Sequence, residues 1–183
     1  MKYRVKFSLV LAFFFAVIGS SAGANNGMKN LINNYENWQF FTDQVMGGVS
    51  SGKLALSNEG ANKFLRMTGV VSTENNGGFI QFRSSVSGLN NEVSGVSLRV
   101  RGNGEKYYVF LRTTGTILPW QYYSAEFISG TDWQDIKLPI SDFSKSNFLL
   151  RKKISPESIR SVGVVAFGKN YDALVEVSSI TFY

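Results

Sequence analysis

The sequence predicts an all-β protein, a two-sheet antiparallel sandwich of the jelly-roll type. Short segments alternate apolar and polar side chains. From Val96 to Arg101, three aliphatic residues share one face, and a serine and two arginines share the other. Eighteen glycines against three prolines favour tight turns and bulges over helices. Because helix signals are also few, the chain is expected to form many short strands around one core.

About ten strands are expected, separated by segments rich in glycine, asparagine and serine. A turn over residues 27–34 precedes the first strand, and Pro156 after a serine predicts a short helical turn. The Gly-Asn-Gly segment at 102–104 is typical of a hairpin turn between its two neighbouring strands. The expected strands cover residues 35–41, 52–57, 63–71, 78–83, 96–101, 106–113, 121–128, 133–138, 162–167 and 174–182.

The first 24 residues differ from the rest and have the organisation of a cleaved export signal. Three basic residues precede an apolar run over 7–18, and small residues follow it. The Ala22-x-Ala24 pattern places the cut after Ala24, with the bond after Ala22 as the second choice. The alternative is a retained membrane anchor, although the run is shorter than the ~20 residues that span a bilayer. We therefore expect one domain over residues 25–183, exported to the periplasm or beyond the cell.

Composition excludes several classes of site. The chain has no cysteine and no histidine, so disulfides, thiolate or imidazole metal sites and Ser-His-Asp catalysis are ruled out. Nineteen basic residues, less three in residues 1–24, leave 16 − 13 = +3 for the exported chain. That charge gives no argument for nucleic acid binding. No second segment is apolar enough to cross a membrane.

Little in the sequence supports catalysis. Asp43, Glu126 and Asp142 are candidates for a glycosidase-like carboxylate pair, but no spacing argues for any two of them. The Gly-x-Gly at 102–104 lies between strands and lacks the helix that a phosphate-binding loop needs. We expect a protein that is not an enzyme and that uses no cofactor or metal.

Five segments, taken in order, resemble the complex I intermediate-associated protein 30 family. That family has a D-x-V-M-G-G-V-S stretch, a G-G-F, a V-R-G-D-G-x-x-Y turn, a Y-x-A-x-F strand and a W-x-x-x-x-L-P-x-x-D-F segment. The first of these is the specific one, and the resemblance covers roughly residues 35–182. The matching segments are Asp43 to Ser50, Gly77 to Phe79, Val100 to Tyr107, Tyr123 to Phe127 and Trp133 to Phe143.

The resemblance implies a galactose-binding-like jelly roll. It also suggests a role as an assembly chaperone, since the family takes its name from a mitochondrial assembly factor of respiratory complex I. The mitochondrial factor works on the matrix side, whereas a cleaved export signal would put this chain on the opposite face of the membrane. Asn103 stands where the family usually has Asp, so any role that needs a carboxylate there is in doubt.

Candidate binding residues come from three places in the chain. Asp43 is either a ligand for a cation or sugar hydroxyl or a cap for backbone amides, and Met46, Gly47 and Gly48 either pack a turn or line a contact surface. Trp120 could lie at a rim where it stacks on a sugar ring or anchors a protein partner, joined by Tyr122. The third set is expected to share one polar sheet face, which either binds a ligand or is simply solvated: Arg99, Arg101, Arg112 and Glu126.

Two further expectations concern packing and membranes. Trp38 and Trp133 lie within strand patterns and are expected in the core. The segment from Phe148 to Lys153 joins three apolar and three basic residues. It either touches an anionic membrane surface or forms a solvated loop whose apolar part reaches the core.

Taken together, the sequence predicts a non-catalytic binding module. The leading interpretation is a protein-interaction or assembly domain with an envelope or membrane protein partner. The alternative is a carbohydrate-binding module, with a glycan as ligand. A glycan site requires exposed aromatic rings over a cleft, whereas a docking site requires a broader apolar patch with a polar rim. Burial of Trp120 and Tyr122 would weigh against the glycan alternative.

Overall fold

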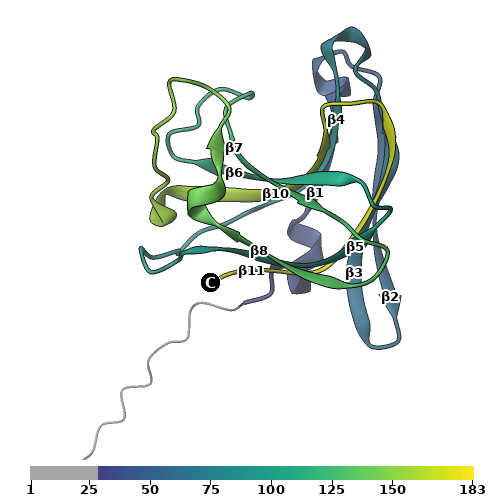
Figure 1. Ribbon diagram of the computed structural model, residues 1–183, viewed down its shortest axis with the longest axis horizontal. Coiled ribbons are helices and arrows are strands. Elements are labelled where there is room, and N and C mark those ends of the chain that lie inside the picture. Colours follow the sequence, from purple (N-terminus) through teal and green to yellow (C-terminus); the bar gives the residue numbers. More distant parts are fainter. Residues whose placement is uncertain (1–28) are drawn as a thin grey trace, which may run out of the picture.

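A computed structural model describes residues 29–183, and the expected export signal lies outside these residues. Two antiparallel sheets face each other, one above the other in the view of Figure 1, with the C-terminus in the lower sheet. Within residues 29–183, no helix is long and apolar enough to span a bilayer. The predicted two-sheet sandwich is confirmed.

The six-stranded sheet carries the surface on which the candidate site lies. Its strand order is β1-β4-β10-β6-β7-β9, and every pairing is antiparallel. Neighbours that are far apart in sequence, such as β4 and β10, show that the fold depends on long-range pairing. The strands are β1 (Gln39–Thr42), β4 (Phe79–Ser85), β6 (Lys106–Thr113), β7 (Tyr123–Ile128), β9 (Ser144–Lys145) and β10 (Ile159–Phe167).

The five-stranded sheet has the order β2-β3-β11-β5-β8, again fully antiparallel. Its strands are β2 (Ser51–Glu59), β3 (Asn62–Val71), β5 (Gly95–Gly102), β8 (Gln134–Pro139) and β11 (Tyr171–Phe182). One 3₁₀ turn, η1 (Leu31–Asn37), precedes the first strand. The others join strands and are η2 (Asp43–Met46), η3 (Glu74–Asn76), η4 (Ile140–Asp142) and η5 (Pro156–Ser158).

The core lies between the sheets and follows from the alternation of side chains along each strand. Val96, Leu98 and Val100 of β5 are buried, while the residues between them point outward or are partly exposed. Trp38, just before β1, is buried edge-to-face against Phe82 with ring centroids 5.3 Å apart, as predicted. Removing this apolar surface from water is the main stabilising contribution in a domain without disulfides.

The expected hairpin at residues 102–104 is wrong. β5 pairs with β11 and β8 in one sheet, whereas β6 pairs with β10 and β7 in the other. The Gly-Asn-Gly turn therefore carries the chain from one sheet to the other. A local turn signal specifies a tight reversal, with Gly104 at φ 83°, but it does not specify which strands then form hydrogen bonds.

Two smaller expectations also need correction. Residues 35–37, the expected start of the first strand, belong to η1, which continues the turn expected before that strand. The Asn30 side chain accepts a hydrogen bond from the Ile32 N–H and caps η1. Trp133 is half-buried on the outer face of the five-stranded sheet and is not in the core. A strand pattern shows that a side chain alternates, but it does not show which of the two faces is covered.

Candidate functional site

The D-x-V-M-G-G-V-S segment is organised around one buried carboxylate. Asp43 is fully buried at the start of η2. One carboxylate oxygen accepts the Ser50 N–H at 2.9 Å, and the other accepts the Ser50 hydroxyl and the N–H groups of Gly78 and Phe79. Of the two interpretations of Asp43, the geometry favours the one in which it caps backbone amides, because the buried carboxylate already accepts four hydrogen bonds from Ser50, Gly78 and Phe79.

The electrostatics of Asp43 follow from these contacts. Burial alone would raise the pKa of its carboxyl, but the hydrogen bonds from Ser50, Gly78 and Phe79 outweigh burial and lower the pKa. The carboxylate therefore stays ionised and holds two distant segments of the chain together.

Glycines are needed around this carboxylate because there is no room for a side chain. A Cβ on Gly48 would lie 2.3 Å from Asp43 Cγ, and a Cβ on Gly77 would lie 2.4 Å from Asp43 Oδ2. Gly47 has a different role: it ends η2 at φ 89°, in the left-handed region. The three glycines thus allow the 43–50 loop to fold over Asp43 and present Met46 outward.

Met46 lies at the edge of a groove of about 840 Å³ on the outer face of the six-stranded sheet. Strands β1, β4, β10 and β6 supply the floor, and the loops around η2 and residues 117–122 supply the walls. The groove is lined by Phe41, Val45, Met46, Phe79, Gln81, Arg83, Phe110, Arg112, Ile117, Pro119, Trp120, Tyr122, Ser146, Ser161, Gly163 and Phe167.

Aromatic rings cover much of the groove floor. Phe110 and Tyr122 are stacked with centroids 3.9 Å apart and planes within 9°, and Phe167 meets Phe110 edge-on at 5.9 Å. Burial of the ring raises the pKa of the Tyr122 hydroxyl. Tyr123 points the other way, into the core, as the alternation of strand residues requires.

The rim of the groove is apolar and exposed. The exposed fractions are 72% for Val45, 57% for Met46, 84% for Ile117 and 56% for Trp120. Exposed apolar side chains gathered around one concavity are typical of a surface that contacts another molecule. Trp120 is thus at a rim, as expected from its loop position.

The groove becomes basic where β4 and β6 flank β10. Arg83 of β4 and Arg112 of β6 both line it. The Arg112 guanidinium donates to the Leu118 carbonyl oxygen at 2.8 Å, which ties the 117–120 loop to the sheet. Desolvation by burial, together with repulsion from Arg83, lowers the pKa of Arg112.

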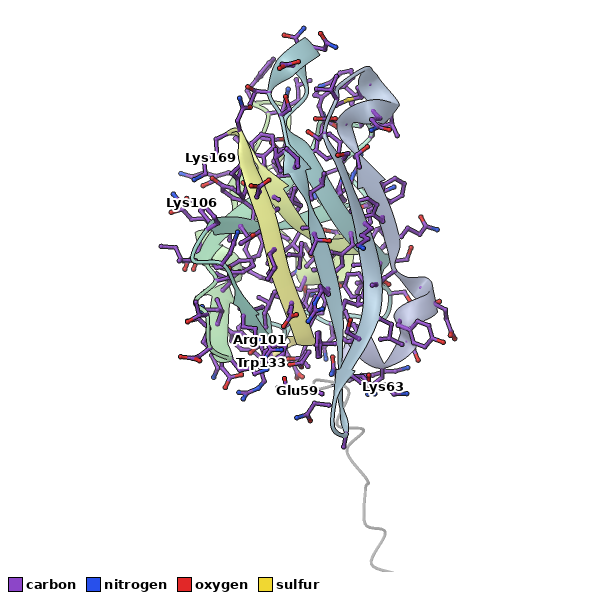
Figure 2. All side chains as sticks on the ribbon, turned by 90° about the vertical axis from the view of Figure 1, so that its right-hand side faces the viewer. Glu59, Lys63, Arg101, Lys106, Trp133 and Lys169 are labelled. Atoms are coloured by element: carbon purple, nitrogen blue, oxygen red, sulfur yellow. The ribbon has the colours of Figure 1, made fainter. Side chains whose placement is uncertain are left out.

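Arg99 and Arg101 do not share a face with Arg112, which corrects the sequence-based expectation. They lie on the outer face of the five-stranded sheet, because β5 and β6 belong to different sheets. Figure 2 labels Arg101 beside Glu59 and Trp133, near the tip of the β2–β3 hairpin. Arg101 forms ion pairs with Glu59 and with the buried Glu176, and its guanidinium lies 4.6 Å from the Trp133 ring centroid.

The remaining carboxylate candidates are separate from one another. Glu126 lies on β7 and pairs with Lys106 at 3.0 Å. Asp142 is exposed in η4, and Asp43 is buried behind the 43–50 loop. These three carboxylates therefore lie on different elements, and only Glu126 lies on the same sheet as the groove.

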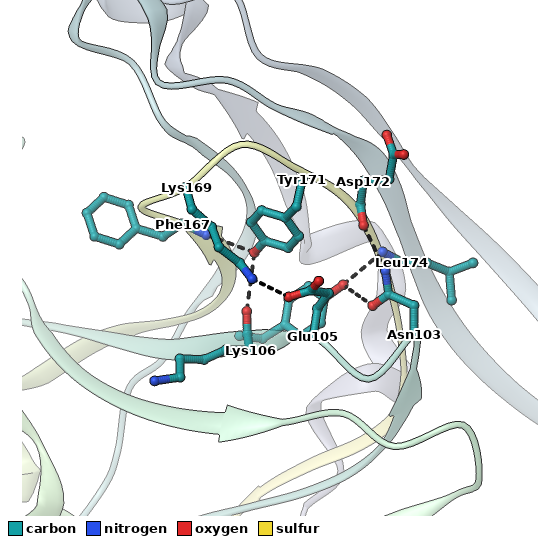
Figure 3. Close-up of polar contacts among 9 residues, drawn as sticks. Asn103, Glu105, Lys106, Phe167, Lys169, Tyr171, Asp172 and Leu174 are labelled. Carbon is teal, nitrogen blue, oxygen red and sulfur yellow. Dashed lines mark hydrogen bonds and ion pairs between the residues drawn. The ribbon is translucent and has the colours of Figure 1, made fainter.

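Asn103 has a structural role at the crossing between the sheets (Figure 3). Its side-chain oxygen accepts the Tyr107 hydroxyl at 2.8 Å, and its amide donates to the Asp172 carbonyl at 2.7 Å. The Tyr107 hydroxyl in turn accepts the Leu174 N–H. The amide donor suits this position, because a carboxylate could not donate to Asp172.

The segment from Phe148 to Lys153 follows the solvated-loop interpretation only in part. Leu150 is buried, but Phe148 and Leu149 are exposed. The three basic residues after them are also exposed.

Sequence reasoning missed most of the groove floor, namely Gln81, Arg83, Phe110, Gly163 and Phe167. Each lies within an expected strand, but the alternation alone did not show which face of that strand would be exposed. The missing information was which strands are neighbours, because β4 and β6 are joined only through β10, which comes later in the chain.

Comparisons with known proteins give one family and one fold. The family model described as Complex I intermediate-associated protein 30 matches residues 29–174. No curated protein matches the chain.

Among solved structures, a family 11 carbohydrate-binding module from Clostridium thermocellum, in complex with a mixed-linked tetrasaccharide, has a TM-score of 0.68 at 12% identity. The match covers 85% of this chain and 94% of that one. A family 30 module of a cellulosomal cellulase from the same organism has a TM-score of 0.57 at 14% identity, covering 80% and 91%. At this level of identity, these likenesses show the fold alone, a galactose-binding-like jelly roll.

Proposed function

Because the chain belongs to the Complex I intermediate-associated protein 30 family, we propose that it is a non-catalytic protein-interaction module that docks a partner through the groove of the six-stranded sheet. The observation that carries the proposal is the exposed apolar rim of Val45, Met46, Ile117 and Trp120. Apolar and aromatic side chains contact a protein surface well, and Trp and Met are among the residues enriched in such interfaces.

Rigid support of the rim favours docking without chemistry. Asp43 fixes the 43–50 loop, and Arg112 fixes the 117–120 loop. A preorganised surface loses less conformational entropy on binding than a mobile one. If the first 24 residues act as an export signal, the partner is an envelope or membrane protein. A complex I subunit is one member of that class.

The proposal is tested by crosslinking the tagged protein in its native cells and identifying by mass spectrometry what co-purifies. Trp120→Ala and Met46→Ala are expected to reduce capture of a specific partner by at least about tenfold, as removal of a central anchor does. Val70→Ala and Leu174→Ala are matched controls, because these exposed residues lie on the other sheet. Equal capture by the groove variants and wild type would contradict docking through the groove.

A second candidate, a carbohydrate-binding module, is supported by the aromatic rings in the same groove. Trp120 is exposed and Tyr122 lines the groove, and aromatic faces stack on sugar rings. A glycan array followed by calorimetry tests this candidate. Glycan binding that Trp120→Ala and Tyr122→Ala abolish, with no protein captured in cells, would replace the protein-docking proposal.

A further inference from the structure

We infer that the basic end of the groove is an anion pocket, in which Arg83, Arg112 and Arg160 bind a carboxylate of an acidic side chain carried by the docked partner. The pocket has a volume of about 310 Å³. It adjoins the groove, because Arg83, Arg112 and Ser161 line both. This inference rests on the proposed docking function and names the chemistry of what docks.

The strand register brings two of the arginines to opposite sides of β10. Arg83 on β4 is paired with Gly163, and Arg112 on β6 is paired with Ser161. Since Gly163 has no side chain and Ser161 has a small one, nothing bulky stands on β10 between these two positions. The floor of the pocket is therefore open between two positive groups. The Arg83 guanidinium lies 4.5 Å from the Phe41 ring centroid, which leaves its N–H groups without a carboxylate partner within residues 29–183.

A β-bulge adds the third arginine. The register of β10 against β6 shifts between Ile159 and Ser161, so Arg160 has no residue opposite it on β6. Bulges of this kind turn a side chain to a new direction, and Arg160 lines the pocket as a result. Its guanidinium donates to the carbonyl oxygens of Glu157 and Ile159, which holds it in place.

No carboxylate of residues 29–183 forms an ion pair with any of these three arginines. Within residues 29–183, all six ion pairs involve other basic residues: Arg66, Arg99, Arg101, Lys106 and Lys169. Residues 1–28 contain no Asp or Glu that could supply a partner. Glu157 is the acidic residue nearest to Arg160 in sequence, and its carboxylate accepts from Asn91.

Uncompensated arginines in a partly buried pocket favour an anionic ligand. Burial lowers the Arg112 pKa, and repulsion from Arg83 lowers it further. A bound anion would remove that repulsion and accept several charge-assisted hydrogen bonds. Guanidinium groups match carboxylates in shape because two N–H groups meet two oxygens. An acidic side chain suits the pocket because the apolar rim beside it favours a protein chain.

Selection of short peptides from a displayed random library on the purified protein tests the inference without knowing the partner. Sequences with Asp or Glu next to apolar or aromatic residues are expected to be enriched. For the selected peptides, Arg160→Gln and Arg83→Gln should each weaken binding about tenfold, as loss of a hydrogen bond to a charged group does. Arg99→Gln removes the same charge on the other sheet and is the matched control, expected to leave affinity unchanged.

A titration with sodium succinate, followed by NMR of the ¹⁵N-labelled protein, tests the pocket alone. Shifts at the amides of Arg83, Arg112 and Ser161 that disappear in Arg160→Gln would support the anion pocket even if no partner is captured in cells. Peptide binding that needs Trp120 but is insensitive to Arg160→Gln and Arg83→Gln would overturn the pocket and leave the docking proposal intact. Preference for oligogalacturonate over every acidic peptide would overturn the protein assignment in favour of an acidic glycan.

Discussion

At the scale of single residues, Asp43 links the two most distinctive motifs of the chain. Its carboxylate accepts N–H groups from Ser50, seven residues on, and from Gly78, thirty-five residues on. Asp43→Asn would turn an amide donor toward at least one of these donors and remove the charge. We expect a loss of about 2–3 kcal/mol in the free energy of unfolding, as for other hydrogen bonds to charged groups, measured by urea denaturation.

The pH dependence follows from the same carboxyl. Since folding lowers its pKa, its contribution is present above the unfolded value near 4 and is lost as pH falls through the folded value. Asp43→Asn should therefore flatten the acid limb of a stability profile. Asp142→Asn, at an exposed position, is the control. An acid limb that is the same in wild type and Asp43→Asn would contradict this role.

For Tyr107, we expect a corresponding dependence of stability on pH in the alkaline range. Burial raises the pKa of its hydroxyl to about 12, against an ordinary value of 10.0. Its stabilising contribution is therefore complete below pH 10 and declines as pH rises toward 12, because the unfolded chain loses the proton first. Tyr107→Phe should reduce this alkaline decline and, since Asn103 and the Leu174 N–H lose a partner, cost about 1–3 kcal/mol at neutral pH. Stability that is flat from pH 9 to 12 in wild type would refute the prediction.

At the scale of elements, the 43–50 loop contains two glycines that are required for different reasons. Gly47 has a positive φ but open space around it, whereas Gly48 has ordinary φ but no space beside Asp43. Gly47→Ala should cost about 1–2 kcal/mol from backbone strain alone. Gly48→Ala should cost about 3 kcal/mol or more, because the new methyl must displace the buried carboxylate. Thermal unfolding of both variants checks the order, and a larger loss for Gly47→Ala would contradict the proposed packing around Asp43.

The elements also show how far the sequence could predict this structure. Alternation located the strands well, because the period of two is a property of the strand itself: residues 106–113 are both expected and observed. Pairing depends on the whole chain, so the turn at 102–104 could not reveal that β5 and β6 lie in different sheets. The groove was missed for the same reason. Trp120 and Tyr122 can be predicted as binding candidates from their residue type. Arg83 and Gly163 become candidates only once the pairing of β10 with β4 is known.

At the scale of the whole molecule, two groups of arginines on the outer faces of the two sheets have different surroundings. On the five-stranded sheet, the buried Glu176 lies between Arg66 and Arg101 and pairs with both. On the six-stranded sheet, Arg83, Arg112 and Arg160 form no ion pair within residues 29–183. The first arrangement stabilises the fold, and the second leaves charge available to a ligand.

The same substitution on the two faces should therefore have different effects. Arg101→Gln leaves Glu176 with one of its two cationic partners and removes the contact with Trp133, so we expect a loss of about 1–3 kcal/mol. Arg160→Gln breaks no ion pair and removes only the hydrogen bonds to the Glu157 and Ile159 carbonyl oxygens, so we expect a smaller loss of about 1 kcal/mol or less. Urea denaturation of both variants at one ionic strength makes the comparison. A large loss for Arg160→Gln would mean that this arginine supports the fold, and the uncompensated charge on this face would then need another explanation.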